Sequence, residues 1–556
     1  MFKILSAIIL TCISIHVSAQ ETYKITYEKY THQKKISESN PTLVLANSQK
    51  TIIGTSNSFD EYRFYPNEIT YYTNEEPNNI YSLIQFDSLQ TIKTIDTISL
   101  KKHEFKKLNG TKKILGLRAK HAQIIINSNT IDLWYVDNIN IKAAPNTVGL
   151  DLGFVLEHTR NNNYTIRASK IERIKNDPTE KYHDEINLPT LDPLTYKDLV
   201  WKSKFITVPL LQNQEINFGN EITSNDSILR FAHGTIAVRK IRLPRIRKGS
   251  QIFLDINQIS NGDAYDRTGS AFLIPFNKKQ SFLDGLKNGI NKLPIYENGN
   301  GKKYQGITLT QDYEPLIELM RFFTPFGIDK YNYIQIKDKE WHKIASYRQD
   351  ISEYYDLLND KEVYIGFFIG NYDKGGHKID ANITIHDSNK QLIPNNKILA
   401  LFNTTNVMEM AGQEYPTLFN SDQGLRIEFE LKDDWKNAKL RYTTTGHGGW
   451  ENGDEFVPKV NSIFIDDKKV FSLAPWRQDC GAYRLYNPAS GNFDNGLSSS
   501  DYSRSNWCPG TVTNPYIIEL GDLKAGKHTI QVKIPQGETE GGSFSSWAVS
   551  GVLLGE

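Results

Sequence analysis

The chain has 556 residues, of which 65 are Lys or Arg and 64 are Asp or Glu, so its formal net charge is +1. This balance excludes a protein that binds nucleic acid by neutralising phosphates, and it equally excludes an acidic tail protein. The 29 Tyr, 26 Phe and 8 Trp residues are too many for a disordered chain, and they suit β-sheets and sugar-binding surfaces. The length predicts three or four domains, each large enough to bury its own core.

The first residues have the pattern of a secretory signal peptide. Lys3 supplies a positive end, residues 4–17 are an apolar run, and Ala19 ends a small-residue cleavage site. A membrane anchor is the alternative, but it needs about 20 apolar residues. We therefore expect residues 1–19 to be removed and the mature chain to be secreted or periplasmic. No later window is apolar enough to cross a bilayer, so no membrane contact is expected.

Short strand patterns dominate the rest of the chain. Alternating or β-branched runs are separated by Gly, Asn, Asp or Pro, which is typical of an all-β fold of sandwiches or jelly rolls. Helical periodicity is scarce, and the two helices that the pattern predicts cover residues 313–323 and 341–358. The clearest strand runs begin at Tyr23, Gln123, Gln251, Ile379, Ile463 and Thr529.

Two changes in composition divide the chain into three blocks. Three prolines stand among charged residues where apolar content falls, which predicts a linker over residues 176–200. A weaker boundary lies near Asp387. We therefore expect a β-rich N-terminal domain over residues 20–175, followed by domains over residues 201–387 and 388–556.

Common catalytic motifs are missing from the sequence. It contains no GxSxG, Walker A, HExxH, EF-hand or His-x-His pattern. Its 12 His residues are scattered, so neither a metal site nor a cofactor is expected.

Two acidic loops are the candidates for chemistry. NGDAYDRTG surrounds Asp266 and GHGGWENGDEF surrounds Glu455, and each places carboxylates beside glycine and aromatic residues. Loops of this composition are also ordinary turns that face solvent. Because the two loops belong to different blocks, they are suited to line a cleft between two domains. Asp266 would then be a water-activating base, and the adjacent Arg267 its positioning cation.

The cysteines predict one disulfide. Removal of the leader with Cys12 leaves Cys480 and Cys508, an even pair in an oxidising compartment. A metal site built on these cysteines is the alternative, but the nearest histidines, His447 and His528, lie far away in the sequence.

Five short segments of the second and third blocks form a recognisable series. They read DAYDR at 263–267, RFFTPF at 321–326, LRYTTTGHG at 440–448, Glu455, and RSNWCPG at 504–510. In this order they resemble the peptide-N-glycosidase F family, secreted bacterial enzymes that remove whole N-linked glycans from asparagine. Cys480 matches the cysteine that the family bonds to the one in its R-x-x-W-C-P-G motif.

The resemblance implies two consecutive jelly-roll β-sandwiches that together form the catalytic unit. It implies an amidase that hydrolyses the bond between asparagine and the innermost GlcNAc of N-glycans. The glycan leaves as a glycosylamine, and Asn becomes Asp. The expected substrates are N-glycosylated proteins and glycopeptides, the expected state is a monomer, and no cofactor is needed.

The resemblance also assigns roles to residues. Asp266 is implied to activate water, Arg267 to orient Asp266 or the sugar, and Glu455 to hydrogen-bond substrate or water. Arg504 and Trp507 are implied to contact the first sugars, with the Trp507 ring stacked on a pyranose. Plain core packing is the other reading of a tryptophan beside a disulfide.

The sequence departs from the family in several places. Two family disulfides are missing, one just before the catalytic Asp-Arg pair and one that brackets the catalytic glutamate. A second family glutamate should fall within residues 366–371, where there is no carboxylate. His447 replaces the family's substrate-contacting tryptophan, and Trp450 is close enough in sequence to take its place. These changes affect the expected glycan preference more than the reaction.

The first block has a resemblance of its own. KILG at 113–116, DLWYV at 132–136 and GLDLGFVLE at 149–157 are similar to secreted β-rich proteins named for a GLPGLI signature, with Asp151 in place of its proline. An extended form of the peptide-N-glycosidase F family carries an extra N-terminal bowl-like domain, and the length of this chain fits that form. In this block the loop 138–146 is the strongest candidate for a contribution to a site.

Two other classes of function are compatible with the sequence. A glycan-binding protein that has lost catalysis is suggested by the missing second glutamate and the extra domain. A glycosidase would use Asp266 and Glu455 as an acid–base pair and would cleave between sugars. The products separate the three: Asn converted to Asp, an unchanged glycopeptide, or a residual sugar on the peptide.

Overall fold

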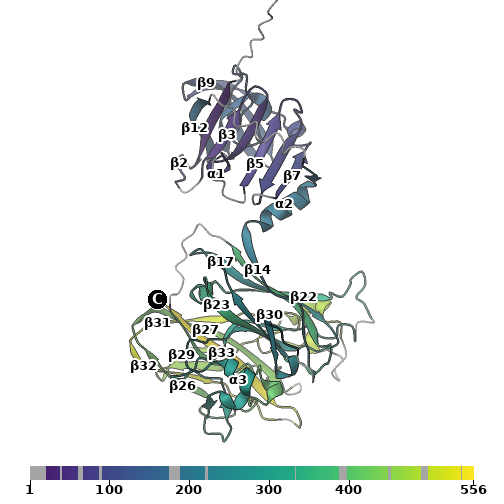
Figure 1. Cartoon of the computed structure of the whole chain (residues 1–556), viewed down its shortest axis with the longest axis vertical. Coiled ribbons are helices and arrows are strands. Elements are labelled where there is room, and N and C mark those ends of the chain that lie inside the picture. The colour runs from purple at the N-terminus through teal and green to yellow at the C-terminus, as the bar shows by residue number, and fades with distance from the viewer. Residues whose placement is uncertain are drawn as a thin grey trace, which may run out of the picture. The chain divides into compact units, whose positions relative to one another are not determined.

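The chain folds into two compact units, Met1–Lys204 and Phe205–Glu556 (Figure 1). The predicted signal peptide, residues 1–19, lies outside the described residues. The computed structural model describes residues 21–37, 40–59, 67–86, 90–174, 188–219, 223–331, 334–386, 397–448, 452–489, 497, 499–539 and 541–556.

A single 13-stranded sheet forms the first unit, in the order β13-β7-β6-β5-β4-β3-β1-β12-β11-β10-β9-β8 with β2 beside β1. The β13 strand runs parallel to β7, and the other described pairings are antiparallel. The strands are β1 (Thr22–Thr31), β2 (Lys34–Lys35), β3 (Thr42–Ala46), β4 (Lys50–Thr55), β5 (Asn67–Thr73), β6 (Ile80–Gln85), β7 (Thr91–Asp96), β8 (Lys106–Ile114), β9 (Leu117–Ile126), β10 (Asn129–Val136), β11 (Phe154–Arg160), β12 (Tyr164–Ile174) and β13 (Thr190–Leu191), and a short helix α1 (Ser56–Phe59) follows β4.

Tight turns set the register of this sheet. Asn127 and Ser128, between β9 and β10, have φ of 47° and 64°, the sign that a type I′ hairpin turn requires. In β10 the side chains of Ile131, Leu133 and Tyr135 alternate into the core. The sequence between β10 and β11 packs on the same core through buried residues such as Leu150.

The described part of the predicted linker, residues 188–200, contains β13 and most of a helix. Asp192 caps α2 (Pro193–Lys202), because its Oδ1 accepts hydrogen bonds from the backbone N–H groups of Leu194 (3.1 Å) and Thr195 (3.0 Å). Tyr196 and Val200 on this helix pack with Ile84 of β6. Pro193, one of the three prolines of the predicted linker, therefore stands at a helix start, and α2 belongs to the first unit.

Two β-sandwiches form the second unit. In the first, the sheet β14-β24-β17-β22 faces the sheet β15-β16-β23-β18-β21-β30, and both sheets contribute to one core. Its strands are β14 (Phe205–Ile216), β15 (Ile228–Phe231), β16 (Ile236–Arg242), β17 (Gln251–Ser260), β18 (Thr268–Leu273), β21 (Ile317–Phe323), β22 (Ile344–Asp350), β23 (Glu362–Ile369), β24 (His377–His386) and β30 (Val512–Thr513), with helix α3 (Phe282–Asn288) and the short pair β19 (Ile295–Tyr296) and β20 (Tyr304–Gln305) between β18 and β21.

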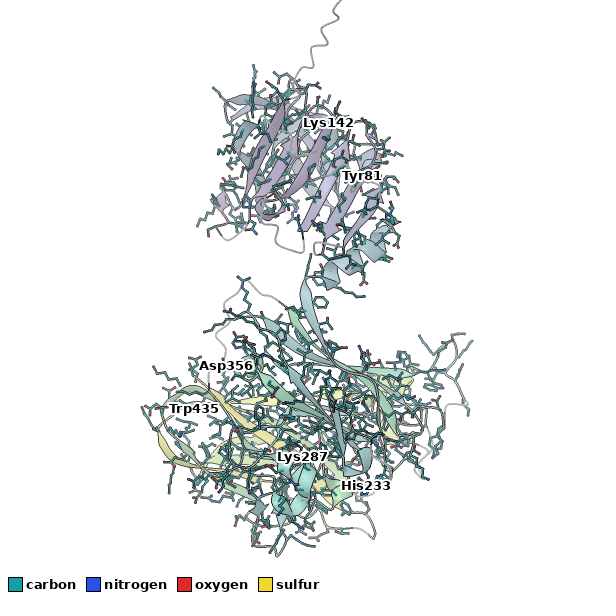
Figure 2. All side chains as sticks on the ribbon, in the orientation of Figure 1. Tyr81, Lys142, His233, Lys287, Asp356 and Trp435 are labelled. Carbon is teal, nitrogen blue, oxygen red and sulfur yellow. A yellow bond between two sulfur atoms is a disulfide. The ribbon has the colours of Figure 1, made fainter. Side chains whose placement is uncertain are left out.

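In the second sandwich, the sheet β25-β33-β27-β31 faces β26-β32-β28-β29. Trp435 at the start of β27 is buried in its core (Figure 2). The predicted all-β fold, with two consecutive jelly-roll sandwiches after a β-rich domain, is confirmed. The strands are β25 (Lys397–Asn403), β26 (Leu425–Leu431), β27 (Trp435–Gly448), β28 (Asn461–Ile465), β29 (Lys468–Leu473), β31 (Tyr516–Leu523), β32 (Gly526–Lys533) and β33 (Ser545–Gly555).

Both predicted helices are wrong. Residues 313–323 contain the strand β21, and all seven of its residues are buried. A strand covered on both faces has no alternation, so its apolar run resembles a helix. Residues 341–358 contain β22, a 3-10 turn, and only one α-helical turn, α4 (Tyr355–Leu358).

A buried charge network joins the two sandwiches. The Arg321 guanidinium of β21 donates to both Glu318 oxygens at 2.9 and 2.7 Å, and it reaches the second sandwich at Thr445 Oγ1 (3.0 Å) and Thr405 Oγ1 (2.9 Å). Arg441 of β27 donates in return to the Glu318 carbonyl oxygen at 3.0 Å. Because Arg321 and Glu318 have no access to water, this network holds the two sandwiches in one arrangement.

We predict that Arg321→Met lowers the free energy of unfolding by about 3–5 kcal/mol, because Glu318 is left as a buried charge without its partner. Denaturant unfolding of the intact chain measures the change. The control Arg242→Met breaks an exposed ion pair with Asp360 and should cost less than about 1 kcal/mol. Equal losses in the two variants would contradict a structural role for the network.

Candidate active site

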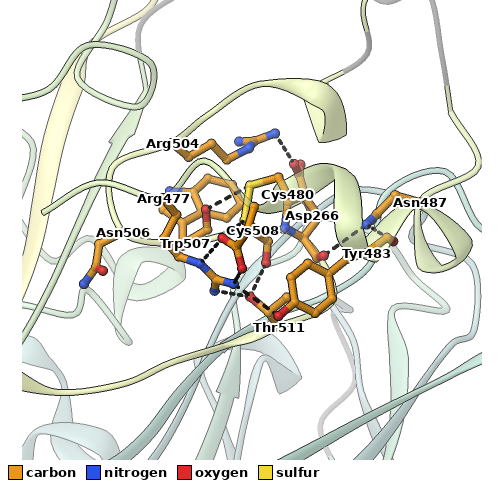
Figure 3. Close-up of a disulfide and its surroundings, with 12 residues drawn as sticks. Asp266, Arg477, Cys480, Tyr483, Asn487, Arg504, Asn506, Trp507, Cys508 and Thr511 are labelled. Carbon is orange, nitrogen blue, oxygen red and sulfur yellow. Dashed lines mark hydrogen bonds and ion pairs between the residues drawn. A yellow bond between two sulfur atoms is a disulfide. The ribbon is translucent and has the colours of Figure 1, made fainter.

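The two acidic loops meet at one buried cation. Asp266 lies between β17 and β18 of the first sandwich, and Glu455 follows β27 of the second. Arg504 Nη2 lies 3.1 Å from Asp266 Oδ2 (Figure 3), as the dashed line between them marks. Arg504 Nη1 donates to Glu455 Oε1. The Arg504 side chain is fully buried, whereas those of Asp266 and Glu455 are 16% and 17% exposed. One guanidinium thus holds a carboxylate from each sandwich at the edge of solvent.

Arg504 is fixed by its own segment. Its backbone pairs with that of Arg477 through N–H to O bonds of 2.8 and 2.9 Å. The predicted disulfide between Cys480 and Cys508 is confirmed, and it joins the same two segments just beyond this pairing (Figure 3). Burial lowers the pKa of Arg504 to about 10, against the opposing effect of Asp266, so the group stays charged at neutral pH.

The Arg504 guanidinium packs on the face of the Trp507 ring. The Arg504 Cζ atom lies 4.1 Å from the centroid of the Trp507 ring, and the same ring stacks on Phe323 at 4.2 Å. Its Nε1 donates to the Gly446 carbonyl oxygen at 2.9 Å, and only 3% of the residue is exposed. This differs from the sugar contact expected of Trp507, because neither it nor the fully buried Arg504 has a surface free for a pyranose.

Arg267 binds Asp263 and does not pair directly with Asp266, while its predicted contact with the sugar stays a prediction. Its Nε donates to Asp263 Oδ2 at 2.6 Å, and His377 Nε2 lies 3.5 Å from the same oxygen. Burial opposes the charge on Asp263, but His377 and Arg267 outweigh it and lower the pKa of Asp263 to about 2. The Asp263–Arg267 pair therefore fixes the turn that carries Asp266, and Arg504 is the cation beside Asp266.

A polar cavity of about 200 Å³ opens beside Asp266. It combines charged groups with tyrosine and tryptophan rings, a lining typical of a site for a polar ligand. The lining residues come from both sandwiches: Asp266, Arg267, Thr268, Phe368, Gly370, Tyr372, Thr404, Asn406, Glu409, Tyr415, His447, Ser546, Trp547 and Ala548.

Glu409 lines the cavity, although the sequence analysis did not predict it as a site residue. The segment 366–371 has no carboxylate, yet its Phe368 and Gly370 line the same cavity as Glu409. Glu409 Oε1 accepts hydrogen bonds from the hydroxyls of Tyr372 (2.9 Å) and Tyr415 (2.8 Å). Burial and the Glu409 charge raise the pKa of Tyr372 to about 12, which keeps that hydroxyl protonated. Glu409 lies on a 3-10 turn of the second sandwich, and no motif marks it.

Polar contacts hold the Glu455 loop in place. Asp454 is fully buried and accepts hydrogen bonds from Trp547 Nε1 (2.7 Å) and the Gly537 N–H (3.0 Å). The Ser505 N–H donates to the Glu455 carbonyl oxygen at 2.9 Å. Trp450, the proposed substitute for the family's tryptophan, lies outside the described residues.

His447 lines the cavity at the position predicted for substrate contact.

In the described part of the chain, no group of three or more His, Cys, Asp or Glu residues is placed to hold a metal ion. None of the described helices is long and apolar enough to span a membrane.

Asp266 lines a polar cavity at the junction of the two sandwiches, and Glu455 contacts the same arginine, an arrangement that suits a hydrolase of the acid–base type. Comparison with known families narrows this class. Residues 207–385 match the family model of peptide-N-glycosidase F, N terminal, and residues 414–554 match its C-terminal counterpart. Residues 25–198 match the N-terminal domain described for an N-glycanase peptide.

Solved structures agree with the family models. A structure of PNGF-II in space group P21 is 50% identical, covers 96% of this chain and 99% of that chain, and has a TM-score of 0.88. A second PNGF-II structure, in space group C2, is 50% identical over 96% of this chain and 98% of that one, with a TM-score of 0.82. No curated protein matches the chain. The chain belongs to the peptide-N-glycosidase F family, in the form with an extra N-terminal domain, and is an N-glycan amidase.

We predict that Arg504→Met lowers kcat/KM by about 100-fold or more, because Asp266 and Glu455 lose the positive charge between them. Steady-state kinetics on a glycopeptide measure the loss. Arg504→Lys keeps the charge without bridging both carboxylates and should fall between the wild type and Arg504→Met. Arg426→Met, which breaks a surface ion pair of the second sandwich, should leave kcat/KM unchanged. Near-wild-type kinetics of Arg504→Met would contradict this account.

Proposed function

We propose that the chain hydrolyses the amide between the asparagine side chain and the innermost GlcNAc of N-glycosylated proteins and glycopeptides. The observation that carries the proposal is the placement of Asp266 and Glu455, from different sandwiches, on one buried Arg504. A substrate in the neighbouring cavity would have its scissile amide beside a fixed carboxylate.

Asp266 is the base in this proposal. It takes a proton from water, and the water oxygen attacks the carbonyl carbon of the asparagine side chain. The tetrahedral intermediate collapses with cleavage of the C–N bond, and the leaving nitrogen takes the proton back. The products are a glycosylamine and an aspartate. Arg504 Nη2 lies 3.1 Å from Asp266 Oδ2, so a fixed positive charge stands beside the base.

Glu455 and Glu409 position the reactants. Glu455 Oε2 accepts the Gly448 N–H at 3.3 Å while Oε1 binds Arg504, so the carboxylate is fixed and suited to hold water or substrate. Glu409 fixes the two tyrosines of the cavity. Tyr372 is 58% exposed, and we assign to its ring the sugar contact that was expected of Trp507.

The cellular setting is also a proposal. The pattern of residues 1–19 and the Cys480–Cys508 disulfide both suit a secreted or periplasmic protein. We propose that the mature chain acts there as a monomer.

Mass spectrometry of a treated glycopeptide tests the function. The proposal expects a peptide in which Asn has become Asp, with no sugar attached. A peptide that keeps a sugar would indicate a glycosidase, and an unchanged glycopeptide would indicate a glycan-binding protein. Either result overturns the proposal.

We predict that Asp266→Asn lowers kcat by about 10²- to 10⁴-fold, because the amide keeps the shape of the side chain but cannot accept a proton. Single-turnover cleavage of a glycopeptide measures the rate. Asp255→Asn, which alters a carboxylate of β17 that pairs with Arg348 and does not line the cavity, serves as the control. If Asp266→Asn retained more than about a tenth of the activity, Asp266 would not be the base.

We predict that Glu409→Gln raises KM about tenfold and changes kcat by less than about threefold. A tenfold change corresponds to about 1.4 kcal/mol, the order of one hydrogen bond to a charged group. Glu414→Gln, near Lys302 on the surface, is the matched control and should change neither constant. A fall in kcat as large as that of Asp266→Asn would show that Glu409 takes part in the chemistry.

A further inference from the structure

His447 is hydrogen-bonded through one of its two ring nitrogens, Nε2, to the buried residue Thr445. It lies near the end of β27 and lines the cavity beside Asp266. Its Nε2 is 2.7 Å from Thr445 Oγ1. The centroid of its ring lies 5.6 Å from that of Phe323 and 5.5 Å from that of Trp507. Among the described residues, none hydrogen-bonds to Nδ1.

The neighbours of Thr445 decide which nitrogen carries the proton. Arg321 Nη1 donates to Thr445 Oγ1 at 3.0 Å, and a guanidinium can only donate. In the described part of the chain, the one acceptor in reach of the Thr445 hydroxyl proton is His447 Nε2. If Nε2 were itself protonated, the buried hydroxyl proton would have no acceptor, which is costly.

The charged form of His447 is equally unfavourable. Burial lowers the pKa of His447 to about 3, and the guanidinium groups of Arg321 and Arg504 act in the same direction. The carboxylates of Glu318, Asp266 and Glu455 are paired with these two arginines, and Glu409 accepts hydrogen bonds from Tyr372 and Tyr415 across the cavity. The ring is therefore neutral and accepts at Nε2.

We infer that Arg321 and Thr445 hold His447 as the tautomer protonated on Nδ1, and that this N–H donates to a carbonyl oxygen of the substrate. The carbonyl belongs either to the scissile amide or to the N-acetyl group of the innermost sugar. Both are neutral acceptors, for which an uncharged donor is suited. His447 would touch substrate, whereas Thr445 and Arg321 are positioning residues. The substrate contact rests on the proposed function, but the tautomer does not.

Nitrogen NMR of the intact chain, labelled with ¹⁵N-histidine, tests the tautomer. His447→Asn identifies the His447 signals by their loss. We expect Nδ1 to have the shift of a protonated nitrogen and Nε2 that of an unprotonated one, unchanged from about pH 5 to pH 8. Thr445→Val should mix the two tautomers, and Thr445→Ser should keep the wild-type pattern. A signal protonated at Nε2, or one that titrates near pH 6.5, overturns the inference whether or not the chain cleaves glycopeptides.

Kinetics of two substitutions test the substrate contact. Asparagine places an N–H near the position of Nδ1, and glutamine places one near Nε2, so His447→Asn should keep at least about tenfold more kcat/KM than His447→Gln. A loss confined to kcat assigns the contact to the scissile carbonyl, and a loss confined to KM assigns it to the N-acetyl group. Equal activity of the two variants overturns the contact, even if the NMR result stands.

Discussion

A buried guanidinium that binds two carboxylates from different sandwiches is the interaction on which the site depends. Arg504 has no access to water, so leaving its charge without partners would cost several kcal/mol. Its partners are Asp266 and Glu455, and together they draw one loop of each sandwich to the same point. The disulfide and the Trp507 ring fix Arg504, and the Arg321 network keeps the two sandwiches in register. Moving any of these parts would move Asp266 or Glu455.

Charge pairs and hydrogen bonds fix the two acidic loops of this chain. Asp263 binds Arg267 in the Asp266 loop, and Asp454 binds the indole N–H of Trp547 beside Glu455. In both contacts a buried carboxylate accepts a hydrogen bond from a donor of the protein. Such a contact stabilises the loop only while every partner is in place. Glu409 likewise supplies from the second sandwich a carboxylate that the segment 366–371 lacks.

The sequence predicted the fold class, the disulfide and the two acidic loops, because strand alternation, cysteine parity and local motifs are readable along the chain. The sequence-based predictions failed where residues distant in the sequence determine the burial of a strand or the partner of a side chain. The strand Ile317–Phe323 resembled a helix because neighbours cover both of its faces. Arg267 stood next to Asp266 in sequence, yet its side chain turns to Asp263, and the cation beside Asp266 comes from Arg504. No spacing rule connects Glu409 with residues 366–371, since only the tertiary fold brings them together.

Cleavage of a glycopeptide in H₂¹⁸O tests the central claim most directly. If Asp266 directs water at the side-chain carbonyl, the released peptide contains an aspartate with one ¹⁸O atom in its new carboxylate after a single turnover. Mass spectrometry of the peptide reads this label at one residue, independently of what happens to the sugar afterwards. A peptide that keeps its asparagine and a sugar stub, without ¹⁸O, would contradict the account.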